Sequence, residues 1–304
     1  MNSLTEKTDF LKQLVTILIL CLLSVLLFSI IGAVVANLLF DININHQFSY
    51  HQLANDELNA LKIIQLFSSI GLFIIPPIIY TKLFSDKPLI ELGIKAKTNF
   101  KSIILTVLIM LVVMPFLSFT IEINSKLILP EFMSAIEEWM KQSEEQSMLL
   151  ISSFLKMDNF LDFLFIFLLV AILPAVGEEL LFRGVLQKLF IKWTKKYHLG
   201  IWITAIIFSA LHMQFYGFLP RLILGVMFGY LFFWSKSLWL PILAHLLNNG
   251  SVVIAAYINP DTINESELFS SSDNTLLSIS LIIISFITTA FLLLSLKKTQ
   301  INTV

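Results

Sequence analysis

Residues 171–188 read AILPAVGEELLFRGVLQK, and this stretch decides how the rest of the chain is interpreted. It places two adjacent carboxylates, Glu178 and Glu179, and an arginine, Arg183, inside an otherwise apolar run. Ionisable groups are costly in hydrocarbon, so each one inside a membrane segment is a functional-site hypothesis. The first question is therefore whether the surrounding sequence belongs in a membrane.

The composition is that of a membrane protein. The chain of 304 residues is 57% hydrophobic and 13% charged, with a mean hydropathy of +0.86. Soluble domains carry roughly 25% charged residues. The apolar runs are long enough for membrane helices and lack the short alternation of an outer-membrane barrel. A net charge of −1 gives no reason to expect a nucleic-acid partner.

Hydropathy and periodicity predict an all-α, polytopic integral membrane protein with about eight transmembrane helices. The fourth helix is expected to continue toward residue 193, and the first is expected to be an uncleaved span. The expected spans are roughly 14–40, 61–84, 102–122, 159–180, 200–215, 219–235, 238–257 and 276–296.

These spans divide the chain into four expected parts. Residues 1–123 hold helices 1 to 3, and residues 124–158 form an extracytoplasmic amphipathic segment. Residues 159–258 form a core of helices 4 to 7, and residues 259–304 hold a loop and helix 8. Lysines gather on alternate loops, as Lys95 and Lys196 illustrate. The positive-inside rule assigns those loops, and both termini, to the cytoplasm.

The segment 124–158 has one apolar face. Phe132, Ile136, Trp139 and Met140 recur at helical spacing, and acidic residues occupy the other positions. This pattern is typical of an amphipathic helix lying in the membrane interface. A gate over a cavity is the alternative interpretation.

Further polar groups occur in apolar runs downstream. His212 follows residues 200–211, and His245 and Asn249 lie in the run that begins at Leu238. At 1.5 Å per residue, Glu178 and His212 both lie about 20 Å from the cytoplasmic helix ends, and the other two lie about 10–17 Å in. Three helices thus bring polar groups to overlapping depth, where burial against lipid favours mutual contact.

Helical spacing suggests different tasks for the two glutamates. Glu179 and Arg183 are four residues apart and can form an ion pair. Glu178 points about 100° away around the helix, so it is left for chemistry. His245 and Asn249 are also four residues apart and offer two N–H donors.

Together these groups could hydrolyse an acyl bond. A carboxylate and a histidine hold and activate one water, and two donors hold the developing oxyanion. Phe208, four residues before His212, can pack against its ring. Taken singly, an intramembrane histidine or a Glu–Arg pair is more often structural. No GxSxG motif suggests a covalent nucleophile.

The polar residues form three ordered patterns: Glu178-Glu179-xxx-Arg183, Phe208-xxx-His212 and His245-xxx-Asn249. They resemble the EExxxR, FxxxH and HxxxN patterns of the CPBP intramembrane proteases. That family includes the type II CAAX prenyl endopeptidases and the bacterial Abi proteins. The resemblance covers about 100 residues, 160–257, and makes residues 159–258 the catalytic core.

The resemblance implies a CAAX-protease-like intramembrane endopeptidase of eight helices with a conical catalytic core. Its implied catalytic residues are Glu178 as general base, His212 holding the water, and His245 with Asn249 as oxyanion hole. Glu179, Arg183 and Phe208 are implied as supporting residues. The implied substrate is a membrane peptide or a lipidated protein, and the asparagine- and isoleucine-rich composition suggests a bacterial cytoplasmic membrane.

Two alternatives stay open. No cofactor is expected, because no HExxH occurs and Arg183 would repel a cation beside Glu179. If a metal such as zinc is bound, its expected ligands are Glu178, His212 and His245. A non-proteolytic peptide transporter, or a bacteriocin immunity protein, could use the same groups to bind a peptide without cutting it.

Overall fold

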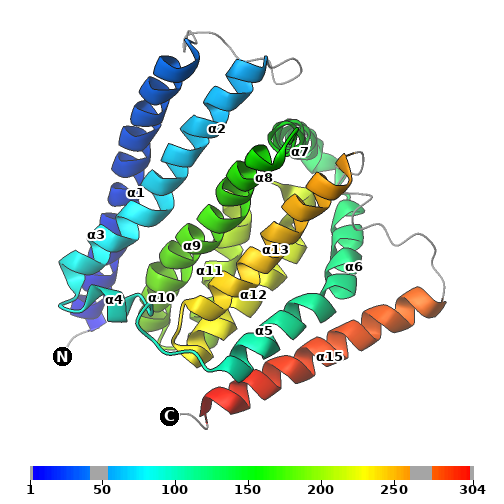
Figure 1. Ribbon diagram of the computed structural model, residues 1–304. Helices are drawn as coiled ribbons and strands as arrows, with labels where there is room; N and C mark the ends of the chain where they lie inside the picture. Colours follow the sequence, from blue (N-terminus) through cyan, green and yellow to red (C-terminus); the bar gives the residue numbers. More distant parts are fainter. Residues whose placement is uncertain (1–2, 42–53, 261–275, 302–304) are drawn as a thin grey trace.

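In a computed structural model, which describes residues 3–41, 54–260 and 276–301, the chain is helical throughout and has no strand in those ranges (Figure 1). The N-terminal helices are α1 (Ser3–Phe40), α2 (Asn55–Ser69), the π-helical η1 (Ile70–Ile74), α3 (Ile75–Phe84) and α4 (Pro88–Glu91). They are followed by α5 (Phe100–Val112), α6 (Met114–Ser125), the short 3-10 turn η2 (Glu131–Met133) and α7 (Ser134–Phe154).

The central element is one continuous helical rod of 35 residues, Phe160–Thr194. It consists of α8 (Phe160–Ile166), the π-helical η3 (Phe167–Ile172), α9 (Leu173–Glu179), the π-helical η4 (Leu180–Leu186) and α10 (Gln187–Thr194). The chain continues through α11 (Tyr197–Leu211), the 3-10 turn η5 (Phe215–Gly217), α12 (Phe218–Ser235), α13 (Trp239–Ile258) and α15 (Leu276–Ile301).

The rod runs through the middle of the molecule (Figure 1). The helices α1 to α3 pack on one side of it, with η1 against α9 and α3 against η4. On the other side α13 packs against η3 and α9, and α11 packs against α10. Both chain ends lie at the same end of the bundle, where α4 and α10 also lie (Figure 1). Any group on the rod is thus surrounded by other helices.

The all-α, polytopic membrane class is confirmed, but fewer helices span than the eight expected. Among the described residues, six helices are long and apolar enough to cross a membrane, and α5 with α6 makes a seventh if that bent pair is one span. The remaining expected span corresponds to α11, which has only 15 residues. It is about 22 Å long, against a hydrocarbon core of about 30 Å.

The bend of 43° between α5 and α6 has a local cause, and a neighbouring helix satisfies the backbone groups that it exposes. Pro115 is the second residue of α6, and proline cannot donate the helical hydrogen bond. Ser285 of α15 repairs the break: its hydroxyl donates to Val112 O at 2.6 Å and accepts from Phe116 N at 3.2 Å. A serine from a neighbouring helix thus satisfies backbone groups that lipid cannot.

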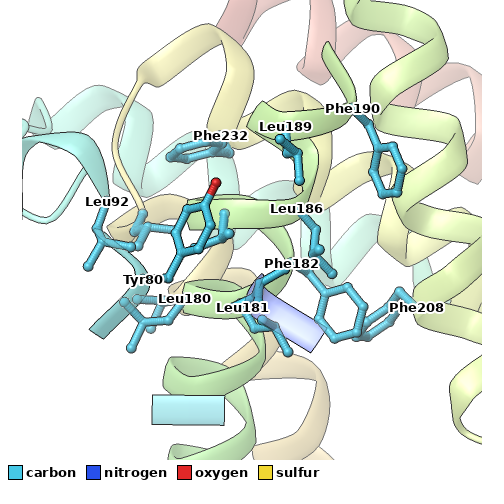
Figure 2. Close-up of a cluster of buried hydrophobic side chains, with 14 of the residues drawn as sticks. Tyr80, Leu92, Leu180, Leu181, Phe182, Leu186, Leu189, Phe190, Phe208 and Phe232 are labelled. Atoms are coloured by element: carbon cyan, nitrogen blue, oxygen red, sulfur yellow. The ribbon is translucent and has the colours of Figure 1, made fainter. Parts of the chain in front are cut away.

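The core beside the rod is built mainly from its own apolar face. Phe182, Leu186, Leu189 and Phe190 pack with Phe208 and with residues from α1, α3 and α12 (Figure 2). Phe182 and Phe208 meet edge to face, with ring centroids 5.1 Å apart. This cluster joins the rod to α11, the helix that precedes His212.

The expected amphipathic helix in residues 124–158 is present as α7. Trp139 of α7 is 48% exposed, and Phe132, in the turn η2 just before it, is 86% exposed. That this apolar face lies in the membrane interface stays a prediction. The rings of Trp139 and Phe215 contact each other, and Glu144 accepts a hydrogen bond from the backbone of Tyr216. Since α7 therefore touches the turn just after His212, the gate interpretation stays a hypothesis.

A tight contact at Gly200 joins α10 to α11. A Cβ at Gly200 would lie 2.7 Å from Ile191 N and 2.9 Å from Ile191 Cα, and backbone atoms cannot yield as a flexible side chain can. Overpacking of this kind costs about 1–3 kcal/mol. We therefore expect Gly200→Ala to lower the melting temperature of the purified protein by several degrees. Leu199→Ala, at an exposed neighbouring position, is the control and should change it little; equal melting temperatures for the two variants would contradict this packing.

Candidate active site

The central interaction of the site is a fully buried ion pair on the rod. Arg183 Nη1 donates to Glu179 Oε1 at 2.8 Å, and neither side chain is exposed. The pairing expected from their spacing is confirmed. The guanidinium also lies over the rings of Phe208 and Phe228, 4.8 and 5.5 Å from the centroids. The charge of Arg183 is thereby compensated on several sides.

His245 of α13 joins this ion pair. Its Nδ1 lies 2.9 Å from Glu179 Oε1, and its ring stacks on Phe228 with centroids 5.4 Å apart. Because a carboxylate paired with arginine can only accept, Nδ1 must carry the hydrogen. The other ring nitrogen, Nε2, then points toward Glu178, with 3.9 Å between Nε2 and Glu178 Oε2.

Glu178 has fewer polar contacts than Glu179. It is 9% exposed. Its Oε2 has no hydrogen-bond partner among the described residues, and the 3.9 Å to His245 Nε2 is too long for a direct hydrogen bond. The contacts of the two glutamates differ: Glu179 Oε1 binds Arg183 and His245, although Glu179 Oε2 also lacks a partner in the described ranges. The catalytic task expected for Glu178 stays a prediction.

His212 caps the C-terminal end of α11 and is not inside a longer helix, as the expected span 200–215 had implied. Its Nδ1 lies 2.8 Å from the carbonyl oxygen of Phe208. A carbonyl can only accept, so Nδ1 carries the hydrogen and Nε2 keeps its lone pair. The ring meets Phe208 edge to face at 4.9 Å, which confirms that expected contact.

Phe208 holds the two histidines around one aromatic ring. It contacts His212 on one side and His245, at 6.1 Å, on another, while Arg183 lies over its face. Glu178 lies near the end of α9, just before η4, and η4 contacts α11, the helix that ends just before His212. Glu178 and His212 make no direct polar contact with each other in the described structure, so their link in catalysis stays a prediction.

Asn249 is directed differently from the expectation. Its amide nitrogen donates to Val170 O at 3.1 Å, and its oxygen accepts from Asn248. Val170 lies in η3, and a π-helical turn shifts the backbone hydrogen-bond pattern. His245 and Asn249 therefore do not offer two free donors to one point. An amide has two hydrogens, so Asn249 keeps one for an oxyanion.

Sequence reasoning missed a second anchor of the rod. Arg183 Nη2 donates to Gly225 O at 3.1 Å, and Gln187 Nε2 donates to Gly229 O at 3.0 Å. A Cβ on Gly229 would lie 2.8 Å from the Gln187 oxygen. Gly225 and Gly229 of α12 therefore supply carbonyl acceptors to the rod. The available signal was that buried Gln187 lies four residues after Arg183 in the same apolar run.

The alternative metal site is not assembled in the described part of the chain. No group of three or more His, Cys, Asp and Glu side chains is placed there to hold a metal ion. Glu179 is held by Arg183 and His245, and His212 faces Phe208. Metal-independent chemistry stays a prediction.

Comparison with protein families matches residues 160–251 to the type II CAAX prenyl endopeptidase Rce1-like family. The membrane-embedded CAAX protease MroQ of Staphylococcus aureus (strain USA300) is 34% identical over 109 residues, which cover 34% of this chain and 43% of MroQ. The uncharacterized protein YpbD of Bacillus subtilis (strain 168) is 32% identical over 82 residues, 26% of this chain and 39% of YpbD. The chain thus matches less than half of the length of either relative. No solved structure matches.

The matched segment contains the rod, α11, α12 and most of α13, and with them all the residues of the candidate site. It agrees with the family resemblance carried by the three motifs. Residues 160–251 therefore match the Rce1-like family of type II CAAX prenyl endopeptidases.

Proposed function

We propose that the protein is an intramembrane endopeptidase that hydrolyses a peptide bond of a membrane-embedded or lipidated substrate. The observation that carries the proposal is the unequal use of two adjacent carboxylates. Glu179 Oε1 is bonded to Arg183 and His245, whereas the nearest polar contact of Glu178 is His245 Nε2 at 3.9 Å. Glu179 Oε2 also lacks a hydrogen-bond partner among the described residues, so the contrast lies in the bonded counter-charge that Glu179 has and Glu178 lacks.

In the proposed mechanism Glu178 is the general base. It takes a proton from a water, and the oxygen of that water attacks the carbonyl carbon of the scissile bond. His212 accepts a hydrogen bond from the same water at Nε2, the nitrogen left with a lone pair. A general base of this kind contributes about 10²–10⁴ in rate. The proton on Glu178 then passes to the leaving amine as the bond breaks.

The oxyanion that forms needs donors. The second amide hydrogen of Asn249 is one, and Val170 holds this amide in place. The second is His245 Nε2, which donates when the ring carries both hydrogens, with Nδ1 held by Glu179. Preorganised donors of this kind are worth more in a low-dielectric site than in water. Glu179 and Arg183 are thus positioning residues, because they act through His245.

The proposed setting is a bacterial cytoplasmic membrane with both termini in the cytoplasm. Both chain ends lie at the end of the bundle that carries the lysine-rich turns around α4, α10 and α12 (Figure 1). Lysine-rich loops face the cytoplasm. The relatives reported above come from two bacteria, which supports the bacterial assignment.

The first prediction concerns Glu178 and His212. We expect Glu178→Gln to lower the cleavage rate by at least about 10²-fold, because the base is lost while shape and hydrogen bonding remain. His212→Ala should do the same. A test substrate is first obtained by comparing the membrane peptides of cells that carry the wild type or Glu178→Ala. Purified variants are then assayed for cleavage and for melting temperature.

Glu131→Gln is the control, since Glu131 is an exposed residue of η2 that lies outside the site. It should cleave like the wild type. Full cleavage by folded Glu178→Gln would contradict the proposal. If that variant also kept the cellular phenotype, it would favour the alternative of a peptide transporter or immunity protein.

The second prediction separates charge balance from positioning. Glu179→Gln leaves Arg183 buried without its counter-charge, so it should destabilise the protein by about 3–5 kcal/mol. The double variant Glu179→Met with Arg183→Met removes both charges at similar volume and should recover most of the melting temperature. It should still not cleave, because His245 has lost its acceptor. Normal cleavage by the stable double variant would show that the pair has no positioning role.

The third prediction concerns metal dependence. Exhaustive chelation of the purified protein should leave the cleavage rate unchanged, because the proposed steps use only side chains and water. The control is a known zinc protease treated in the same buffer, which should lose activity. Loss of cleavage that zinc restores would instead favour Glu178, His212 and His245 as metal ligands.

A further inference from the structure

A cavity lies on the side of the rod that faces α1 and α3. Its volume is about 370 Å³, and it is bounded by α1, α3, α4 and the end of the rod. Gly184 and Val185 line it, whereas none of the catalytic or supporting residues does. The proposed peptidase reaction therefore gives this cavity no role.

Two lysines of the rod border the cavity. Lys188 and Lys192 are four residues apart, so they share one helical face. Lys188 is ion-paired with Glu91 at 3.6 Å, donates to the Glu91 carbonyl and lies 5.3 Å from the centre of the Phe232 ring. It is thus held in one place. Lys192 is exposed and has no ion pair within the described ranges.

Polar and apolar groups share the remaining wall. The Tyr80 hydroxyl donates to Gln13 Oε1 at 3.0 Å, so the amide hydrogens of Gln13 stay available as donors. Phe84, Val185 and Leu189 supply apolar surface in the same cavity. Tyr80 and Leu189 are shown with their neighbours in Figure 2. The cavity therefore offers two cations, neutral donors and an apolar wall side by side.

Its place in the molecule restricts the ligand. The cavity lies at the lysine-rich end of the bundle, where α4 and α10 meet and both chain ends lie (Figure 1). Helices long and apolar enough to span a membrane lie on both sides of the cavity. Because the cavity is near one end of those helices, it lies at the level of lipid headgroups. The negatively charged headgroups of glycerolipids lie at this level, and interfacial lysines attract them. Glu91 can accept from a hydroxyl or ammonium beside that charge.

We propose that this cavity binds the phosphate group of a glycerophospholipid, with Lys188 and Lys192 as the cations that hold it. The acyl end lies against Phe84, Val185 and Leu189, and a headgroup hydroxyl or ammonium meets Glu91. The site rests on its own residues and does not depend on the proposed peptidase activity. Because Gly184 directly follows Arg183, a bound lipid contacts the same rod that carries the catalytic carboxylate.

The test measures the melting temperature of the full-length protein purified in detergent. Three probes are added separately: dioleoyl phosphatidylglycerol, dioleoylglycerol with the same chains but no phosphate, and inorganic phosphate. A ligand that binds the folded state raises its stability. We expect phosphatidylglycerol to raise the melting temperature by several degrees and dioleoylglycerol to raise it far less.

The variants locate the effect. Lys192→Gln should lose at least half of the shift given by phosphatidylglycerol, and Lys188→Gln should lose more. Lys196→Gln removes an exposed lysine one turn beyond Lys192 that does not line the cavity, so it should keep the full shift. If Lys188→Gln fails to fold, Lys192→Gln alone decides, because that side chain has no ion pair to lose within the described ranges.

The outcomes separate the sources of phosphate. A shift with the lipid but not with inorganic phosphate identifies the membrane as the source. Equal shifts with both, and loss of both in Lys192→Gln, identify a phosphate site filled from solution. Equal shifts with phosphatidylglycerol and dioleoylglycerol, or an undiminished shift in Lys192→Gln, would overturn the proposal.

Discussion

The structure depends on how one buried negative charge is balanced. Glu179 has no exposed surface, yet one of its oxygens lies within hydrogen-bonding distance of both Arg183 and His245. A buried charge with a missing partner costs several kcal/mol, so the three groups must stay together. Since His245 belongs to α13, this requirement fixes α13 against the rod. The orientation of His245 Nε2 toward Glu178 follows from the same contact.

Hydrogen bonds from buried side chains of the rod also hold it against α12. Arg183 and Gln187 donate to the carbonyls of Gly225 and Gly229, and a Cβ on Gly229 would lie 2.8 Å from the Gln187 oxygen. In hydrocarbon, backbone carbonyls and side-chain donors have no water to turn to, so such bonds fix helix positions. Glu178 Oε2 and Glu179 Oε2 both lie without a hydrogen-bond partner among the described residues, beside these firmly placed neighbours.

Much of this could be predicted from the sequence. The contact between Glu179 and Arg183 was predicted correctly, as was the contact between Phe208 and His212. Each pair is four residues apart, and helical periodicity alone places such pairs on one face. Contacts between helices were harder. That His245 would bind Glu179, and that Asn249 would bind Val170 O, depends on rotation about helix axes and on a π-helical turn, which no local pattern reveals. The short length of α11 was expected, but its C-terminal end was placed at 215 and not at Leu211, because apolar residues continue past the helix end. The division into four parts and the conical outline stay predictions.

The central claim is that Glu178 and His212 share one water. An experimental structure of the wild-type protein in lipid nanodiscs, at a resolution that shows ordered waters, tests it most directly. We expect a water within about 3 Å of both Glu178 Oε2 and His212 Nε2, with those atoms no more than about 6 Å apart, twice a hydrogen-bond length. A wider separation, or a direct protein partner on Glu178 Oε2, would contradict the proposed mechanism.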